Sequence, residues 1–106
     1  FFYFTLFLIY FQHGYYNSYN GGLYYSEDGI SWEISNITKG VFAGLGYANG
    51  VWTSSDLSPG GLYYSTDGKV WTRVMSGKFK SIKNANGLWV AGGYSGLYYS
   101  TLMQEN

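Results

Sequence analysis

The side chains able to support acid–base, nucleophilic or metal chemistry are few and scattered along this sequence. Its 106 residues include six acidic residues, one arginine (Arg73), one histidine (His13) and no cysteine. A glycosidase needs two carboxylates at a set separation, while a zinc site or a Ser–His–Asp triad is built around histidine or cysteine. Asp28 and Asp67 stand in turn-forming segments, and the other acidic residues show no pairing. We therefore predict no catalytic residue, no metal site and no cofactor.

Aromatic residues and glycine set the fold class. The chain is 23% aromatic and 11% charged, with 16 glycines and one proline. Aromatic side chains favour pleated sheets, and glycine supplies turns with positive φ, so we predict an all-β protein. The formal net charge is zero, which argues against a nucleic-acid partner. Lys78, Lys80 and Lys83 are expected on a solvated strand edge.

The first eleven residues are almost wholly apolar. A membrane-spanning helix needs about 20 such residues, so we predict no membrane span. A strand or two is the favoured interpretation, and a trimmed secretion signal is the alternative. A strand here could complete the last sheet of a neighbouring copy.

Short motifs recur at spacings of 35–39 residues, which indicates an internal repeat. Gly-Leu-Tyr-Tyr-Ser occurs at 22–26, 61–65 and 96–100, and Asn-Gly-apolar-Trp occurs at 49–52 and 86–89. One unit is expected to contain strands at 79–83, 88–91 and 97–100, a hairpin turn at Asn86–Gly87, a loop at 92–95 and, by analogy with 70–74, a fourth strand.

Four short antiparallel strands per unit match one propeller blade. The inner strands are apolar on both faces, as blades covered by two neighbours should be, although a β-sandwich or a β-solenoid remains open. We predict a partial β-propeller of about two and a half to three blades, with repeat units near 1–36, 37–75 and 76–106. Further copies of the chain, or further blades of a longer chain, would close the ring.

The segments Ser-Glu-Asp-Gly-Ile-Ser-Trp (26–32) and Ser-Thr-Asp-Gly-Lys-Val-Trp (65–71) resemble the Asp box. This repeat occurs in bacterial neuraminidases and in many non-enzymatic propellers. Glycine directly follows the aspartate here, a shortened form similar to repeats of phage tail proteins and gut-bacterial surface proteins. The resemblance implies a structural turn, with the tryptophan packed beneath it on the fourth strand. Its structural residues would be Ser26, Asp28, Gly29, Trp32, Ser65, Asp67, Gly68 and Trp71.

The resemblance also shows what this chain lacks as an enzyme. Sialic-acid cleavage in that family implies three arginines and a tyrosine–glutamate pair, whereas Arg73 stands alone. We therefore expect a non-enzymatic binding module, with a glycan as the candidate ligand and an extracellular, cell-surface or virion-surface location. Sugar rings stack on aromatic faces, and the candidate platforms are Trp52, Trp89, Tyr47 and Tyr94.

Three alternatives remain open at this stage. Both Trp52 and Trp89 could simply belong to the core between blades. The chain could be a structural component of a virion or cell surface with no small ligand. It could also be a fragment of a larger neuraminidase-like propeller whose catalytic residues lie elsewhere.

Overall fold

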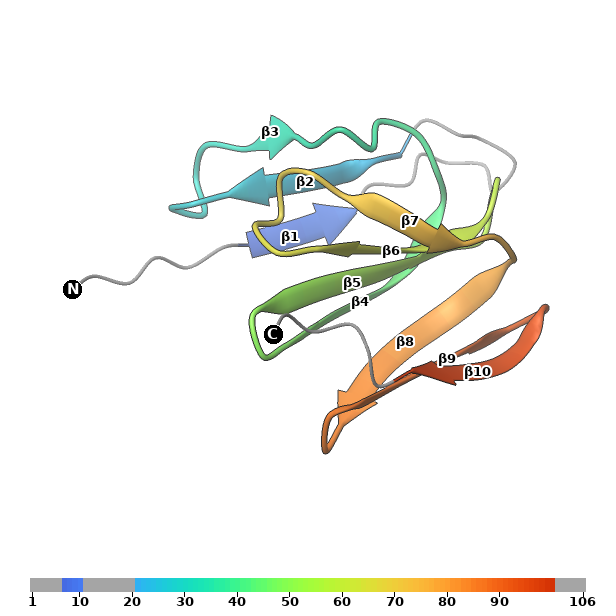
Figure 1. Cartoon of the computed structure of the whole chain (residues 1–106). Helices are drawn as coiled ribbons and strands as arrows, with labels where there is room; N and C mark the ends of the chain where they lie inside the picture. The colour runs from blue at the N-terminus through green and yellow to red at the C-terminus, as the bar shows by residue number, and fades with distance from the viewer. Residues whose placement is uncertain (1–6, 11–20, 101–106) are drawn as a thin grey trace.

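The computed structural model describes residues 7–10 and 21–100, in which ten β-strands and no helix are found (Figure 1). The all-β prediction is confirmed. No helix in this part of the chain is long and apolar enough to cross a membrane. The strands are β1 (Phe7–Tyr10), β2 (Leu23–Ser26), β3 (Glu33–Ile34), β4 (Phe42–Ala48), β5 (Val51–Asp56), β6 (Gly61–Ser65), β7 (Thr72–Met75), β8 (Phe79–Ala85), β9 (Leu88–Gly93) and β10 (Gly96–Ser100).

The strands form three antiparallel sheets, one within each predicted repeat unit. We call them the first sheet (order β1-β2-β3), the second sheet (β4-β5-β6-β7) and the third sheet (β10-β9-β8). The second sheet has the four strands expected of a blade. All three sheets are open in the described part of the chain, and their arrangement as blades of a partial propeller stays a prediction.

The β1 strand pairs with β2 of its own chain, with Phe7 opposite Ser26 and Tyr10 opposite Leu23. A strand within the apolar N-terminal segment is thus confirmed. Within this chain these four residues belong to the first sheet, and the completion of a neighbouring copy's last sheet stays a prediction. The rest of that segment lies outside the described residues.

Two-residue hairpins join β4 to β5 and β8 to β9. Asn49 and Gly50 have φ values of 52° and 82°, and Asn86 and Gly87 have 54° and 83°. Positive φ at both central residues is typical of a type I′ turn, for which Asn-Gly is the preferred sequence. The hairpin expected at Asn86–Gly87 is confirmed.

All four strands with predicted bounds differ at an end: the strand at 79–83 extends to Ala85 and the strand at 97–100 begins at Gly96, while the other two differ for a local reason. Gly92 and Gly93, expected in a loop, belong to β9 because Gly93 pairs with Gly96, which leaves a turn of only two residues. The fourth strand of the second sheet begins at Thr72 rather than Val70. The Val70 N–H is bonded to the Asp67 carboxylate and is therefore not free for the sheet.

The sheets pack face to face through two apolar clusters. Between the first and second sheets lie Leu23, Phe42, Tyr63 and Trp71. Between the second and third sheets lie Val51, Leu62, Phe79, Ile82, Trp89 and Ala91. Each buried side chain of this size contributes about 1.5–3 kcal/mol relative to an exposed one, so these contacts hold the sheets together.

Two glycines of β4 set the distance between the second and third sheets. A Cβ added at Gly44 would lie 3.2 Å from the Cα of Ser81, and one added at Gly46 would lie 3.1 Å from the Trp89 ring. The absence of a side chain thus lets β4 lie almost against β8. The two strands run side by side, and their hairpin turns fall at the same end of the molecule (Figure 1).

Candidate functional site

The two Asp-box segments fold into nearly identical turns. In the second copy the Ser65 hydroxyl donates to the Asp67 carboxylate at 3.0 Å and accepts the Asp67 and Gly68 N–H groups at 3.2 and 2.7 Å. The same carboxylate oxygen accepts the N–H groups of Lys69 and Val70 at 2.8 and 3.0 Å. In this Asx-type turn one oxygen of the aspartate is thus bonded to the Ser65 hydroxyl and to the backbone of its own turn.

The first copy repeats these bonds residue for residue. Ser26 donates to Asp28 at 3.0 Å and accepts the Asp28 and Gly29 N–H groups at 3.2 and 2.8 Å. Asp28 accepts the N–H groups of Ile30 and Ser31 at 2.8 and 2.9 Å. Gly29 and Gly68 have φ values of 81° and 79°, a conformation that other residues resist. The local geometry therefore accounts for the serine, aspartate and glycine of both segments without a bound ligand.

The two tryptophans of these segments differ in burial. Trp71 is 3% exposed, and its ring N–H donates to the Gly68 carbonyl at 3.0 Å. Trp32 is only half-buried. The first sheet covers Trp71, whereas no described sheet precedes the first sheet to cover Trp32 in the same way. The two tryptophans therefore hold the same position in their Asp-box segments, but only Trp71 is a core residue.

Asn36 joins the first sheet to the second Asp-box turn. Its side-chain oxygen accepts the Trp71 N–H at 2.8 Å, and its side-chain nitrogen donates to the Trp71 carbonyl at 3.1 Å. The Asn36 N–H also donates to the Lys69 carbonyl at 3.4 Å. Sequence reasoning missed this contact, because nothing in the spacing of Asn36 marks a partner 35 residues away.

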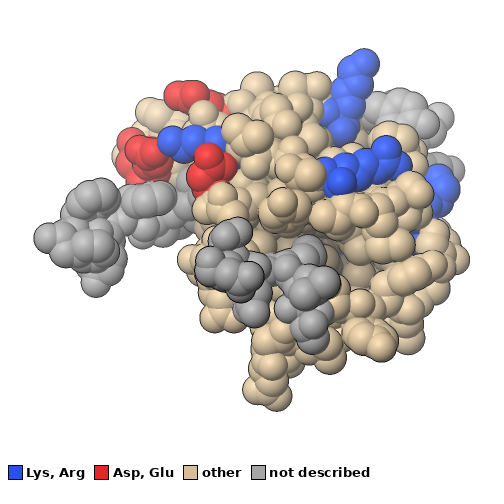
Figure 2. Space-filling model, viewed as in Figure 1, with Lys and Arg blue, Asp and Glu red and all other residues tan. Residues whose placement is uncertain are grey.

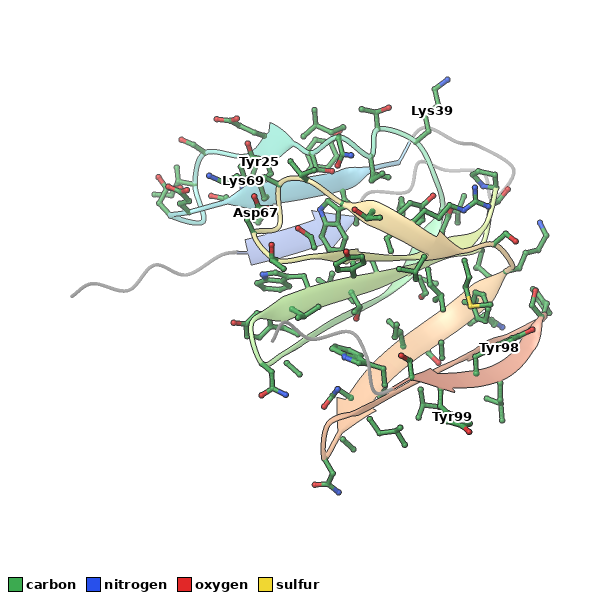
Figure 3. All side chains as sticks on the ribbon, in the orientation of Figure 1. Tyr25, Lys39, Asp67, Lys69, Tyr98 and Tyr99 are labelled. Atoms are coloured by element: carbon green, nitrogen blue, oxygen red, sulfur yellow. The ribbon has the colours of Figure 1, made fainter. Side chains whose placement is uncertain are left out.

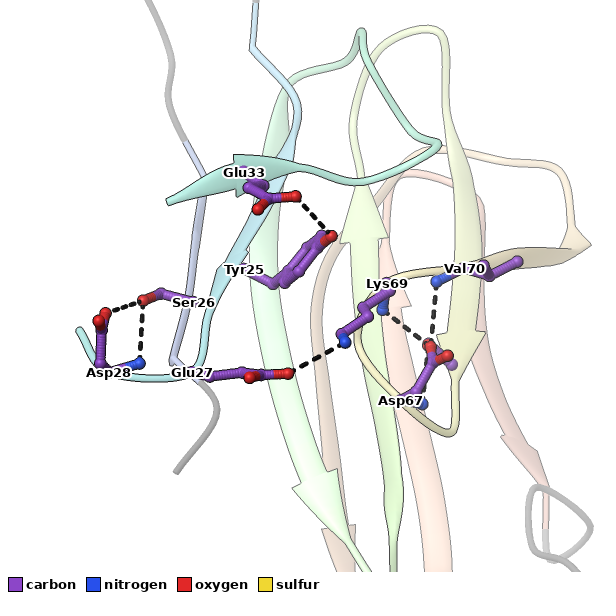
Figure 4. Close-up of polar contacts among 9 residues, drawn as sticks. Tyr25, Ser26, Glu27, Asp28, Glu33, Asp67, Lys69 and Val70 are labelled. Carbon is purple, nitrogen blue, oxygen red and sulfur yellow. Dashed lines mark hydrogen bonds and ion pairs between the residues drawn. The ribbon is translucent and has the colours of Figure 1, made fainter. Parts of the chain in front are cut away.

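An exposed polar bridge links the two turns on the outside (Figure 4). The Lys69 ammonium lies 3.0 Å from the Glu27 carboxylate and 5.5 Å from the centre of the Tyr25 ring, whose hydroxyl donates to Glu33 at 3.0 Å. The hydrogen bond to Glu27 raises the pKa of Lys69, and the bond to Glu33 raises the pKa of Tyr25. Such solvent-exposed pairs contribute little to stability, so the bridge adds little to the contact between the sheets.

The carboxyl groups of both turns have a lowered pKa. At Asp28 the cause is the hydrogen bonds from Ser31, Ile30 and Ser26. At Asp67 partial burial, the largest single influence, raises the pKa, but the bonds from Val70, Lys69 and Ser65 together hold it below its ordinary value. A carboxyl group whose pKa is lowered by folding stabilises the protein at pH values above its ordinary pKa of 3.8. This contribution to stability is lost as the pH falls through the pKa of the folded state.

We therefore expect the two turns to contribute to acid sensitivity. Between about pH 5 and pH 2 the wild-type protein should lose stability more steeply than a double variant with Asp28→Asn and Asp67→Asn, in which these groups no longer titrate. Urea unfolding midpoints across that range measure the difference. Equal slopes for the two proteins would show that the carboxylates are not held in the deprotonated form.

The four aromatic candidates for ligand binding separate into three places. Tyr47 and Trp52 face each other across β4 and β5, with ring centres 4.5 Å apart and an interplanar angle of 47°. Tyr47 is 57% exposed and Trp52 is half-buried, with part of its ring against the cluster between the first and second sheets. Their pairing follows from the turn at Asn49–Gly50, which sets residues 47 and 52 opposite each other.

Trp89 and Tyr94 lie elsewhere. Trp89 is 4% exposed and belongs to the cluster between the second and third sheets, so its ring is not open to a ligand. Tyr94 is 74% exposed in the turn between β9 and β10, with the Lys80 ammonium 5.4 Å from its ring centre. That turn lies at the end of the sheets opposite to the Asn49–Gly50 turn (Figure 1). The structure thus brings together only Tyr47 and Trp52.

Charged side chains are segregated on the face of the molecule drawn in Figure 2. Figure 2 shows the acidic groups gathered at one end of this face with one basic group among them, and the other basic groups toward the opposite end. The acidic end includes Glu27 and Asp67, and the basic group there is Lys69, which pairs with Glu27 (Figure 3). Lys39 lies at the upper right of the same view, away from Lys69 and Asp67. Neither end brings together three groups able to hold a metal ion within the described residues.

Asp56 is a structural residue that sequence reasoning overlooked. It is fully buried at the end of β5, where one carboxylate oxygen accepts the N–H groups of Val41 and Ser58 at 2.8 and 3.1 Å. The other oxygen accepts the Gly60 N–H at 3.0 Å. At the corresponding place in the third sheet the Ser95 hydroxyl accepts the Lys78 N–H at 2.9 Å. Because the two repeats use different residue types, no motif marked Asp56.

No family model, curated protein or solved structure matches this chain.

Proposed function

We propose that this chain is a non-enzymatic recognition module that binds a glycan on the Tyr47–Trp52 pair. The observation that carries the proposal is a 57% exposed tyrosine held against a half-buried tryptophan at the free end of a hairpin. Packing of Trp52 against the core and the rigid turn beside it would fix both rings before a ligand arrives. A preorganised aromatic surface loses little conformational entropy on binding.

The chemistry of a sugar suits this pair. The apolar face of a pyranose ring can stack on an aromatic ring, while its hydroxyls need polar groups at the rim. The Asn49 amide, in the exposed turn next to the pair, is the nearest candidate in sequence for that role. Repetition of weak sites in an assembly would raise the overall affinity by avidity.

We also infer that the three sheets are blades of a propeller of the Asp-box type. Face-to-face packing, two matching Asp-box turns and a four-stranded second sheet support this assignment. Catalysis has no support in the described residues, since Asp28 and Asp67 bond to their own turns and Asp56 is enclosed by backbone donors.

A glycan array tests the proposed function. We expect reproducible binding by the wild-type chain and at least about a tenfold loss for Tyr47→Ala, since an aromatic contact at the centre of a site commonly carries most of its affinity. Tyr94→Ala removes a tyrosine at the opposite end that is even more exposed (74%) and should bind as the wild type does. The proposal fails if no glycan binds, or if only Tyr94→Ala loses binding.

A structural role without a small ligand is the second candidate. It is favoured by the exposed apolar side chains on the outer face of the third sheet, among them Leu97 and Tyr99. A recognition module and an assembling scaffold can coexist in one chain, because that face and the Tyr47–Trp52 pair lie on different sheets.

A further inference from the structure

The three copies of Gly-Leu-Tyr-Tyr-Ser bury the same leucine to very different extents. Leu23 and Leu62 are 1% and 5% exposed, whereas Leu97 is 81% exposed. The second tyrosine of the motif behaves alike. Tyr25 and Tyr64 pack against the apolar clusters, and Tyr99 is 78% exposed.

Strand geometry explains this pattern. Side chains two apart in a strand share a face, so the leucine and the second tyrosine of each copy point to the same side of their sheet. In the first sheet that side faces the second sheet, and in the second sheet it faces the third. Figure 3 shows Tyr99 on the side of β10 that faces away from the second sheet, opposite to Tyr98, which packs on Phe79.

The outer face of the third sheet therefore corresponds to the face of the second sheet that the third sheet covers. It carries Leu97 and Tyr99 on β10. It also carries Val90 on β9, which is 41% exposed and pairs with Tyr99. Nothing in the described structure covers these side chains. Adjacent exposed apolar side chains on a sheet face are typical of interaction surfaces.

The first sheet offers the complementary face. The first tyrosine of the motif points backward, toward the preceding sheet: Tyr63 is 9% exposed beneath the first sheet. Its counterpart Tyr24 is half-buried and pairs with Ile34, which is 41% exposed. One chain thus carries both halves of a repeat-to-repeat contact, at opposite ends of its stack of sheets.

We propose that the outer face of the third sheet, formed by Val90, Leu97 and Tyr99, docks the back of the first sheet of a second copy of this chain. The contact is head to tail, so successive copies form a closed ring or an open chain according to the rotation at each step. It extends between molecules the packing that already joins the second sheet to the third.

The intermolecular contact differs from the internal one at the first strand. The glycines of β4 that lie against β8 have Ser81 and Lys83 as their counterparts in the third sheet, and both counterparts are exposed on β8. A docked sheet must therefore lie over β9 and β10 and leave β8 free. The smaller contact predicts reversible association in place of a permanent one.

Sedimentation velocity of the intact chain tests the proposal. The wild type should sediment faster as its concentration rises to about 1 mM, the upper end of ordinary weak association. Leu97→Asp and Ile34→Asp should each raise the dissociation constant at least about tenfold, because each places an unpaired charge in the contact. Ile30→Asp is the matched control, since Ile30 is 82% exposed but lies in the first Asp-box turn.

An equimolar mixture of the Leu97→Asp and Ile34→Asp variants is the decisive sample. Each variant keeps one intact face, so the mixture should form a dimer that cannot grow, although neither variant associates alone. Circular dichroism of each variant confirms that the fold is kept. A wild type that stays monomeric, a mixture that forms no dimer, or an Ile30→Asp control that loses association equally would each overturn the proposal.

Discussion

Replacing Trp71 by alanine will lower the free energy of unfolding by about 3–5 kcal/mol. The ring is 3% exposed between the first and second sheets, so its removal leaves a cavity that two sheets line. The change also deletes the ring N–H bond to Gly68 that closes the Asp-box turn. Equilibrium denaturation monitored by far-ultraviolet circular dichroism measures the loss.

Trp32→Ala is the matched control for this prediction. It removes the same side chain from the same position of the other copy, but from a half-buried place. We expect a clearly smaller loss, because less apolar surface returns to water. Equal losses at the two positions would mean that the first sheet does not cover Trp71 as the structure describes.

Asp56→Ala should cost about 3–5 kcal/mol, although the residue belongs to no recognisable motif. Its carboxylate accepts three backbone N–H groups in a fully buried place, and an unsatisfied buried donor costs about 1–3 kcal/mol. The Val41 N–H keeps a second acceptor, the Ser58 carbonyl at 3.0 Å, which limits the loss. Urea denaturation of the purified variant measures the change.

Asp56→Asn and Asp67→Ala provide the comparison. The asparagine retains one acceptor oxygen and should lose less than Asp56→Ala. Asp67→Ala removes an exposed carboxylate whose backbone partners can turn to water, and it should also lose less. If Asp67→Ala proved the more damaging change, the acceptor role assigned to Asp56 would be wrong.

Much of the secondary structure could be predicted because it depends on local rules. Asn86–Gly87 forms its hairpin since only residues tolerant of positive φ fit a type I′ turn. The strands predicted at 79–83, 88–91 and 97–100 are found at 79–85, 88–93 and 96–100, because aromatic and β-branched residues between such turns favour strands. The errors fell where a side chain or a glycine pair alters a boundary, as Asp67 does for β7 and Gly93 for β9.

The site was harder to predict because exposure depends on the neighbouring sheet. Trp52 and Trp89 share the Asn-Gly-apolar-Trp motif, yet one is half-buried beside Tyr47 and the other is enclosed at 4% exposure. The pairing of Tyr47 with Trp52 could have been found, since a two-residue turn at Asn49–Gly50 sets them opposite each other. The bridge from Asn36 to Trp71 could not, because it crosses between sheets.

Hydroxyl-radical footprinting read by mass spectrometry shows whether the repeated sheets pack through one equivalent face. In dilute solution we predict heavy labelling of Leu97 and Tyr99 and strong protection of Leu62, which occupies the same motif position as Leu97. At high concentration, where copies associate, Leu97 and Tyr99 should become protected while Ile30 remains labelled. Equal labelling of Leu62 and Leu97 in dilute solution, or no protection of Leu97 and Tyr99 at high concentration, would contradict packing through this face.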